Sequence, residues 1–185
     1  MKIGQIKIMG SRESWYRLVN GDDLEQGDIL LNIPIVELPV DFPWPQREDT
    51  ERQQTSLVHS IDGIVISQSC DLQQPGKLEF VAFCPIWLLD EIPEFAGKGK
   101  RESLRQGRMV AYHLLDMSSV KGLEHGFVVV EFKRIFSLPI QLTKRLAKEQ
   151  GDRLRLVSPY KEHLSQSFAR FFMRVGLPSD IPKFE

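Results

Sequence analysis

One segment near the C-terminus has the clearest local pattern in the chain, and it restricts the fold more than any other feature. Apolar residues recur there at the three- and four-residue spacing of an amphipathic helix; they are Leu164, Phe168, Phe171, Phe172 and Val175. Ser158 and Pro159 predict the N-cap and the first position of this helix, and Gly176 predicts its end. A helix with one aromatic face has to bury that face against another part of the protein.

The segments before this helix predict short β-strands and turns. A turn at Gly27-Asp28 opens the first strand, since glycine and aspartate favour tight turns. Later strands are predicted from short apolar or alternating runs at 63–68, 78–84, 109–115, 126–136 and 153–157. Short helices are predicted at 86–91, 103–106 and 142–150. Five or six strands closed by one packed C-terminal helix predict a mainly β, α+β fold, in the form of a small and strongly curved β-barrel with short helical insertions.

Alternation within 126–136 predicts which side of that strand faces the core. Residues on a strand point to opposite faces in turn, and the more apolar set here includes Val128, Val130 and Phe132. We expect this set to be buried and the other set to face away from the core.

Length and composition predict one globular domain over 1–185. With 42% hydrophobic and 26% charged residues, the chain can build a sizeable core, and this composition argues against wholesale disorder. A proline-rich stretch at about 37–60 is predicted as a long exposed loop. The first residues alternate charged and apolar side chains unlike a signal peptide, and no apolar run is long enough for a membrane span. We therefore expect a cytoplasmic protein with no membrane partner, in which Cys70 and Cys84 are reduced.

Charge is divided unevenly along the chain, although the net charge is only −1. Between 133 and 174, ten lysines and arginines face three acidic residues; between 21 and 62, ten acidic residues face two arginines. This polarity predicts an anionic partner for the basic region, or a partner whose charges complement both regions. The acidic 37–51 stretch of a second copy is one such partner, which would make the protein a homodimer.

The predicted binding surface follows from these cations. Its residues are Lys144, Arg145, Lys148, Arg153, Arg155, Tyr160, Arg170 and Arg174. The cations would neutralise the phosphates of a nucleic acid or contact an acidic protein segment, and Tyr160 would present an exposed ring. Trp44, between two prolines, is expected either to fold back onto the barrel or to anchor a partner. A solvated helix face without any partner is the plain alternative.

The segment 67–71, Ser-Gln-Ser-Cys-Asp, is the most site-like part of the sequence. It follows an apolar strand, so its polar side chains would emerge together where the strand ends. Cys70 would be a nucleophile there, with His59 or another histidine as its base and Asp71 as the group that orients the base. The alternative is a buried and unreactive Cys70, with polar neighbours that shape a turn. No Cys or His pair has the close spacing of zinc ligands, so we predict no metal site and no cofactor.

Three segments have the order and pattern of a known family: Leu24–Leu30, which contains Gly-Asp-Ile, and the apolar strands at 63–67 and 80–86. Together with the late strand, the basic connection and the terminal helix, they resemble the PemK/MazF-like toxins. This resemblance implies an SH3-like barrel, often dimeric, whose toxin members cut single-stranded RNA without a metal. The chain also resembles uncharacterised bacterial proteins that share a Ser-Gln-x-Cys-Asp motif.

The catalytic positions of those toxins hold residues of another kind in this chain. Ile61-Asp62 takes the place of an arginine, and Cys84-Pro85 takes the place of a Ser or Thr. An arginine would stabilise the charge that builds on the phosphate, whereas an aspartate repels it. We therefore expect a non-catalytic binding or accessory module that engages a protein partner or nucleic acid, in a toxin–antitoxin or phage-defence system. The alternative is an enzyme, either a divergent endoribonuclease or a thiol-dependent activity at the 67–71 segment.

Overall fold

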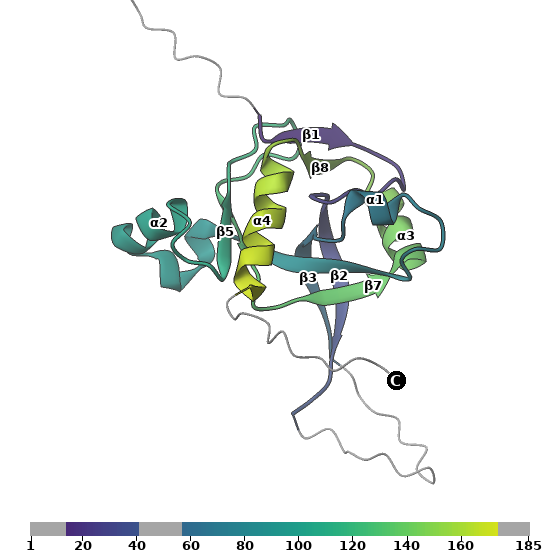
Figure 1. Cartoon of the computed structure of the whole chain (residues 1–185), viewed down its shortest axis with the longest axis horizontal. Helices are drawn as coiled ribbons and strands as arrows, with labels where there is room; N and C mark the ends of the chain where they lie inside the picture. Colours follow the sequence, from purple (N-terminus) through teal and green to yellow (C-terminus); the bar gives the residue numbers. More distant parts are fainter. Residues whose placement is uncertain (1–13, 41–56, 174–185) are drawn as a thin grey trace, which may run out of the picture.

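The computed structural model describes residues 14–40 and 57–173 (Figure 1). Within these ranges the protein is a mixed α/β structure with antiparallel sheets, which agrees with the predicted class. The strands are β1 (Tyr16–Val19), β2 (Ile29–Glu37), β3 (Leu57–Val65), β4 (Phe80–Leu88), β5 (Tyr112–Leu115), β6 (Val128–Glu131), β7 (Phe136–Pro139) and β8 (Arg153–Leu156). The helices are α1 (Ser69–Leu72), α2 (Lys98–Arg105), α3 (Ile140–Gln150) and α4 (Tyr160–Phe172), with 3-10 turns at Leu89–Glu91 and Pro93–Phe95.

Strand β4 connects the two halves of the larger sheet because its neighbours change along its length. Its residues 80–83 pair with β7, its middle pairs with β3, and its residues 86–88 pair with β6. Strand β2 extends this sheet beyond β3, and β5 extends it beyond β6. Residues far apart in the sequence are thereby placed on one continuous antiparallel framework.

The smaller sheet, β1 with β8, is attached to the larger one at the predicted Gly27 turn. Gly27 donates its N–H to the carbonyl of Val65 over 2.9 Å and accepts from the N–H of Leu156 over 3.0 Å. Its φ is +87°, and a Cβ at this position would lie 2.9 Å from the Cβ of Leu156. Only glycine meets both conditions without strain, so the turn joins the two sheets closely.

Three clusters of buried side chains form the core. The largest contains Phe132 and Leu164 and lies beneath α4. The second contains Phe83 and Ala147 and lies between the sheet and α3. The third joins α2 to β6 and consists of Leu89, Phe95, Leu104 and Val129. The set expected to face the core, Val128, Val130 and Phe132, is buried, which confirms that prediction. The third cluster also covers the second face of β6, so Val129, expected to face away from the core, is buried as well.

Helix α4 buries most of its predicted apolar stripe. Leu164 is fully buried, and the rings of Phe168 and Phe171 contact Phe132 with centroids 5.5 and 6.2 Å apart. Phe172, in contrast, is 56% exposed. The last residue of the stripe and the predicted terminating glycine lie outside the described residues. The helix therefore covers the core with its first three turns.

The predicted start of α4 is wrong by one residue. The helix begins at Tyr160, and Pro159 occupies the N-cap, after a cis peptide bond with Ser158. The backbone amides of Tyr160 and Lys161 donate to the carbonyl of Val157, over 2.8 and 3.2 Å. The N-cap residue, Pro159, makes no side-chain cap hydrogen bond, and the Val157 carbonyl satisfies these first amides instead.

Two predictions for 86–91 and 126–136 need correction. The run 126–136 is two strands, β6 and β7, because they pair with opposite ends of β4 and the chain turns at 132–135 between them. At 86–91, β4 continues to Leu88, and only 89–91 form a helical turn. Sheet pairing, which is a tertiary interaction, outweighs the local pattern in both cases.

The predicted loops are also shorter than expected. β2 reaches Glu37 and β3 begins at Leu57, so both ends of the expected 37–60 loop are strand. Residues 41–56 lie outside the described residues. The basic stretch 98–101 forms the first turn of α2, with Gly97 as its N-cap.

Candidate functional site

Arg153 and Arg155, predicted as surface cations, lie in the interior. Both side chains belong to β8, and their exposed fractions are 0% and 4%. The carboxylate of Asp28 accepts from Arg153 Nε over 3.1 Å and from Arg155 Nη2 over 2.8 Å, with a further bond to Arg155 Nε. Three buried charges thus satisfy one another instead of being solvated. These two arginines are not available to contact a phosphate.

Other acidic residues of the early region neutralise further cations of the late region. Glu25 accepts from Arg155 over 2.6 Å and lies 3.5 Å from the ammonium of Lys161. Glu37 forms an ion pair with Arg134. The uneven charge of the sequence is therefore partly compensated within one molecule, through Arg134, Arg153, Arg155 and Lys161.

The cations of α3 remain at the surface. Arg145 lies 3.8 Å from Glu149 one turn later, while Lys144 and Lys148 form no ion pair with a described residue. Single lysines on an exposed helix face are common and do not by themselves define a site.

The polar side chains of the 67–71 segment mainly form hydrogen bonds and ion pairs within the protein. Cys70 is exposed, and its Sγ lies 3.4 Å from the carboxylate of Asp71. Asp71 forms a 2.6 Å ion pair with Lys77, and the hydrogen bonds from Lys77 and Cys70 hold the pKa of this carboxyl below its usual value. Ser69 Oγ accepts the backbone N–H of Gln26 over 3.1 Å, which ties α1 to the Gly27 turn.

His59 is not placed beside Cys70. It lies on β3, and its Nε2 is 3.6 Å from the carboxylate of Glu37. Among the described residues, no histidine is hydrogen-bonded to the thiol, so the predicted nucleophile and base are not brought together. Two residues that were predicted to bind a partner, Trp44 and Arg174, lie outside the described residues.

Tyr160, expected as an exposed ring, is stacked on Trp15. The ring centroids are 4.0 Å apart and the ring planes differ by 11°. Both rings are partly buried at the edge of the largest core cluster. The stack fixes the indole of Trp15 just before β1, where it also borders a pocket.

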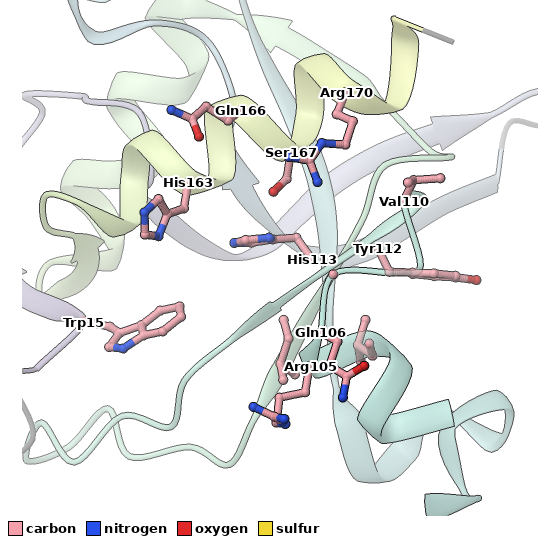
Figure 2. Close-up of a pocket in the computed structure, with 13 residues that line it drawn as sticks. Trp15, Arg105, Gln106, Val110, Tyr112, His113, His163, Gln166, Ser167 and Arg170 are labelled. Carbon is pink, nitrogen blue, oxygen red and sulfur yellow. The ribbon is translucent and has the colours of Figure 1, made fainter. Parts of the chain in front are cut away.

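This pocket has a volume of about 340 Å³ and lies between the end of α2, β5 and one face of α4 (Figure 2). Trp15 stands at one end of it and Arg170 at the other. We name it the α2–α4 pocket. Its polar lining side chains include Arg105, His113, His163, Gln166, Ser167 and Arg170. Its volume is within the range of sites that bind small molecules.

The α2–α4 pocket is positively charged. None of the described residues that line it carries a carboxylate, and the guanidinium group of Arg170 forms no ion pair or hydrogen bond with another described residue. Arg105 donates through Nε and Nη2 to Glu102, over 2.8 and 2.6 Å, and keeps its other N–H groups. These bonds, with one from Gln106, lower the pKa of Glu102 to about 2, so that residue stays charged and holds Arg105 in place.

The backbone carbonyl groups at the end of α2 do little to offset this positive charge, because they accept hydrogen bonds within the turn. The carbonyls of Glu102, Ser103 and Leu104 accept the amides of residues 106, 108 and 107, respectively. The negative end of the helix dipole is therefore partly satisfied within the turn itself.

His113 contributes to the pocket a buried polar atom that has no hydrogen-bond partner among the described residues. Its ring extends from β5 beneath α4 toward the space between His163 and Trp15 (Figure 2). The Nε2 atom is buried and has no hydrogen-bond partner among the described residues. Burial, together with the charge of His163, lowers the pKa of His113 to about 4, so the ring is neutral at pH 7. A neutral ring nitrogen can donate or accept, and a ligand atom could satisfy it.

The sequence prediction missed most of this site. Arg170 was named, but the pocket also depends on α2, whose stretch 98–108 carries five cations and one acidic residue. That local charge was a usable signal, although glycines such as those at 97 and 99 disfavour a helix. The joining of α2 to α4 through β5 is not visible in any single segment.

The described residues contain no group of three or more His, Cys, Asp or Glu side chains that could hold a metal ion. His113 and His163 share the pocket without a third ligand of these types. Within the same ranges no helix has both the length and the apolar composition to cross a membrane, and α4, the longest, has 13 residues.

No protein-family model matches this sequence. No curated protein is significantly similar to it. The site is therefore interpreted from its own chemistry.

Proposed function

We propose that this protein is a non-catalytic binding module that engages an anionic partner at the α2–α4 pocket. The observation that carries the proposal is the composition of the lining, in which two arginines and two histidines occur with no carboxylate among the described lining residues. Arg105 is paired with Glu102 outside the lining, whereas the guanidinium of Arg170 has no counter-ion among the described residues. An unpaired guanidinium in a concave site interacts with an anion more strongly than one on an open surface, because less water screens the pair.

Nucleic acid is the partner that this pocket fits best. It offers phosphates to the arginines and flat rings to an aromatic wall. Trp15 forms such a wall, and its stack on Tyr160 orders the indole before any partner arrives. An acidic protein segment would use the arginines but would leave the aromatic wall without a matching group. A protein partner is therefore the second candidate, favoured only by the charge.

Within the mixed α/β class, we propose that the fold is an SH3-like barrel of the PemK/MazF-like type. Two features support it: one strand, β4, is shared by three others, and the β1–β8 pair closes onto the sheet at Gly27. An accessory role in a toxin–antitoxin or phage-defence system rests on that resemblance alone.

The enzyme alternatives have less support from the geometry. Asp62, at the position of the toxins' arginine, accepts the backbone N–H of Asn32 over 2.8 Å and so has a structural bond. Cys84 is fully buried, and burial together with Glu131 raises the pKa of its thiol to about 12. In the pocket, Ser167 and His113 share no hydrogen bond. None of these groups is arranged as an activated nucleophile.

The proposal is tested by measuring the binding of short single-stranded RNA and DNA as a function of salt. We expect affinity to fall linearly with the logarithm of salt concentration. Arg170→Gln should weaken binding about tenfold and reduce the salt slope by roughly one unit. Lys148→Gln removes a surface cation of α3 and is the matched control, expected to bind like the wild type.

Three outcomes would contradict the proposal. Binding that depends on Lys148 and not on Arg170 would move the site to α3. Absence of any salt-dependent binding would exclude nucleic acid as the partner. RNA cleavage by the pure protein, lost in a single-residue variant, would replace a binding module with an enzyme.

A further inference from the structure

Building on that proposed function, we infer that the α2–α4 pocket holds one nucleotide with a terminal phosphomonoester, either free or at the end of a strand. The inference concerns the ligand of the same site and rests on its size, its charge and the separation of its two ends.

The size of the pocket limits the ligand to one unit. Its volume of about 340 Å³ is near the lower end of the range for small-molecule sites. α2, β5 and α4 surround it on three sides, whereas a strand that passes through would need an extended groove. A terminal nucleotide enters such a pocket, while an internal one would have to continue out of both ends.

The guanidinium of Arg170 attracts a monoester more strongly than a diester. A phosphomonoester carries a charge of about −1.5 to −2 at pH 7, whereas a diester within a strand carries about −1. Arg170 brings a full positive charge that has no counter-ion among the described residues, and Arg105, elsewhere in the lining, brings N–H groups that Glu102 leaves free. A planar guanidinium group binds two phosphate oxygens at once, so Arg170 can hold two of the three terminal oxygens.

The two ends of the pocket separate the ring from the phosphate. Figure 2 places Trp15 at the end opposite Arg170, with His113 between them. A nucleotide has the same order: a flat base, a polar sugar and a phosphate. The indole of Trp15 offers a stacking surface for the base, and the buried Nε2 of His113 offers a hydrogen bond to the sugar or base edge.

The test is calorimetric titration of the full chain with matched probes. Adenosine, guanosine, cytidine and uridine 5′-monophosphates test the free nucleotide, and adenosine and inorganic phosphate test its two halves. One oligonucleotide with either a 5′-phosphate or a 5′-hydroxyl tests the strand end, and a phosphoserine peptide tests a phosphorylated protein. We expect at least one monophosphate, or the 5′-phosphorylated strand, to bind at least about tenfold more tightly than its unphosphorylated counterpart.

Two variants test whether the phosphate binds at the Arg170 end of the pocket and the base at the Trp15 end. Arg170→Gln should weaken the phosphorylated probes about tenfold and leave adenosine unchanged. Trp15→Leu should weaken adenosine and the monophosphates and leave inorganic phosphate unchanged, with thermal unfolding as the check that the variant folds. Arg145→Gln on α3 is the matched control and should leave all the titrations unchanged.

The results with the different probes also distinguish a failure of this inference from a failure of the proposed function. Tighter binding of a free monophosphate identifies a soluble nucleotide as the ligand; tighter binding of the phosphorylated strand identifies a strand end. Equal binding of the two strands, with no binding of monophosphates, would overturn the inference while nucleic-acid binding stands. Binding of the phosphopeptide alone, dependent on Arg170, would replace nucleotide by phosphorylated protein. If no phosphorylated probe and no strand binds, the inference and the proposed function both fail.

Discussion

Arg153 donates its Nε–H to the carboxylate of Asp28 over 3.1 Å, and both side chains are completely buried although 125 residues separate them in the sequence. Arg155 shares the same carboxylate. This contact joins the start of β2 to β8, so it also connects the small sheet to the large one. The charge that makes the late region look like a binding surface is here part of the interior.

Asp28→Asn should strongly destabilise the protein. The substitution keeps the size of the side chain but leaves two buried guanidinium groups without a counter-charge, which costs about 3–5 kcal/mol in other proteins. Urea unfolding followed by circular dichroism measures the change in the free energy of unfolding. Asp22→Asn, at an exposed position in the same loop, is the control and should change it by less than about 0.5 kcal/mol. A loss as small as that of the control would mean that the buried cluster does not hold the two sheets together.

Gly27→Ala should cost more than the same change at Gly76. Both glycines have positive φ, +87° and +75°, so each alanine is strained by about 1–2 kcal/mol. Only at Gly27 does the new Cβ also meet Leu156, at 2.9 Å, whereas nothing lies within 4 Å at Gly76. We expect a further loss of about 1–3 kcal/mol for Gly27→Ala, measured by thermal unfolding of the two variants. Equal losses would show that the Leu156 contact relaxes without cost.

The stability of the protein should fall in mild acid because of His113. Burial lowers the pKa of this histidine to about 4 in the folded state, while an unfolded histidine has a pKa of about 6.5. Between these values the unfolded chain binds more protons, so the free energy of unfolding decreases as the pH falls through this window, by about 3 kcal/mol in total. His113→Phe removes the titrating group and should flatten this dependence, as measured by urea unfolding from pH 7 to pH 4. His59→Phe changes an exposed ring on β3 and should retain the wild-type profile.

The two thiols should react very differently with an aromatic disulfide reagent. Cys70 is exposed, and we expect it to react in the native protein at the rate of an ordinary accessible thiol, because the nearby cation, Lys77, is already paired with the Asp71 carboxylate that the thiol contacts. Cys84 is buried, its thiol pKa is raised to about 12, and it should react only after unfolding. Cys70→Ser should abolish the native reaction. A native rate far above that of a free thiol would revive the interpretation of 67–71 as a catalytic segment.

Local patterns predicted the elements that depend on neighbouring residues. The Gly27 turn, the strand that includes Gly63, the helix at 142–150 and the strand at 153–157 all exist, with ends that differ by a few residues. Each combines a turn or stop signal with a regular apolar period, which short-range interactions are enough to impose.

The errors fall where distant partners decide the outcome. The break at 132–135 follows from the separate pairing of β6 and β7 with the two ends of β4, and the burial of Val129 follows from the packing of α2. The candidate site, too, could be predicted only in part from local sequence patterns. Arg170 was predicted to bind an anion, but its neighbours Arg105, His113 and Trp15 come from three other parts of the chain.

The sequence by itself determined that strands and helices are combined, the glycine turn before β2 and the apolar stripe of α4, because these depend on residue type and short spacing. Only the tertiary structure decided which charges are buried and which are free. An arginine looks the same in a sequence whether a carboxylate lies beside it or not, and that difference decides its electrostatic energy. Arg153 meets Asp28 and stabilises the interior, while Arg170 meets no described carboxylate and faces the pocket.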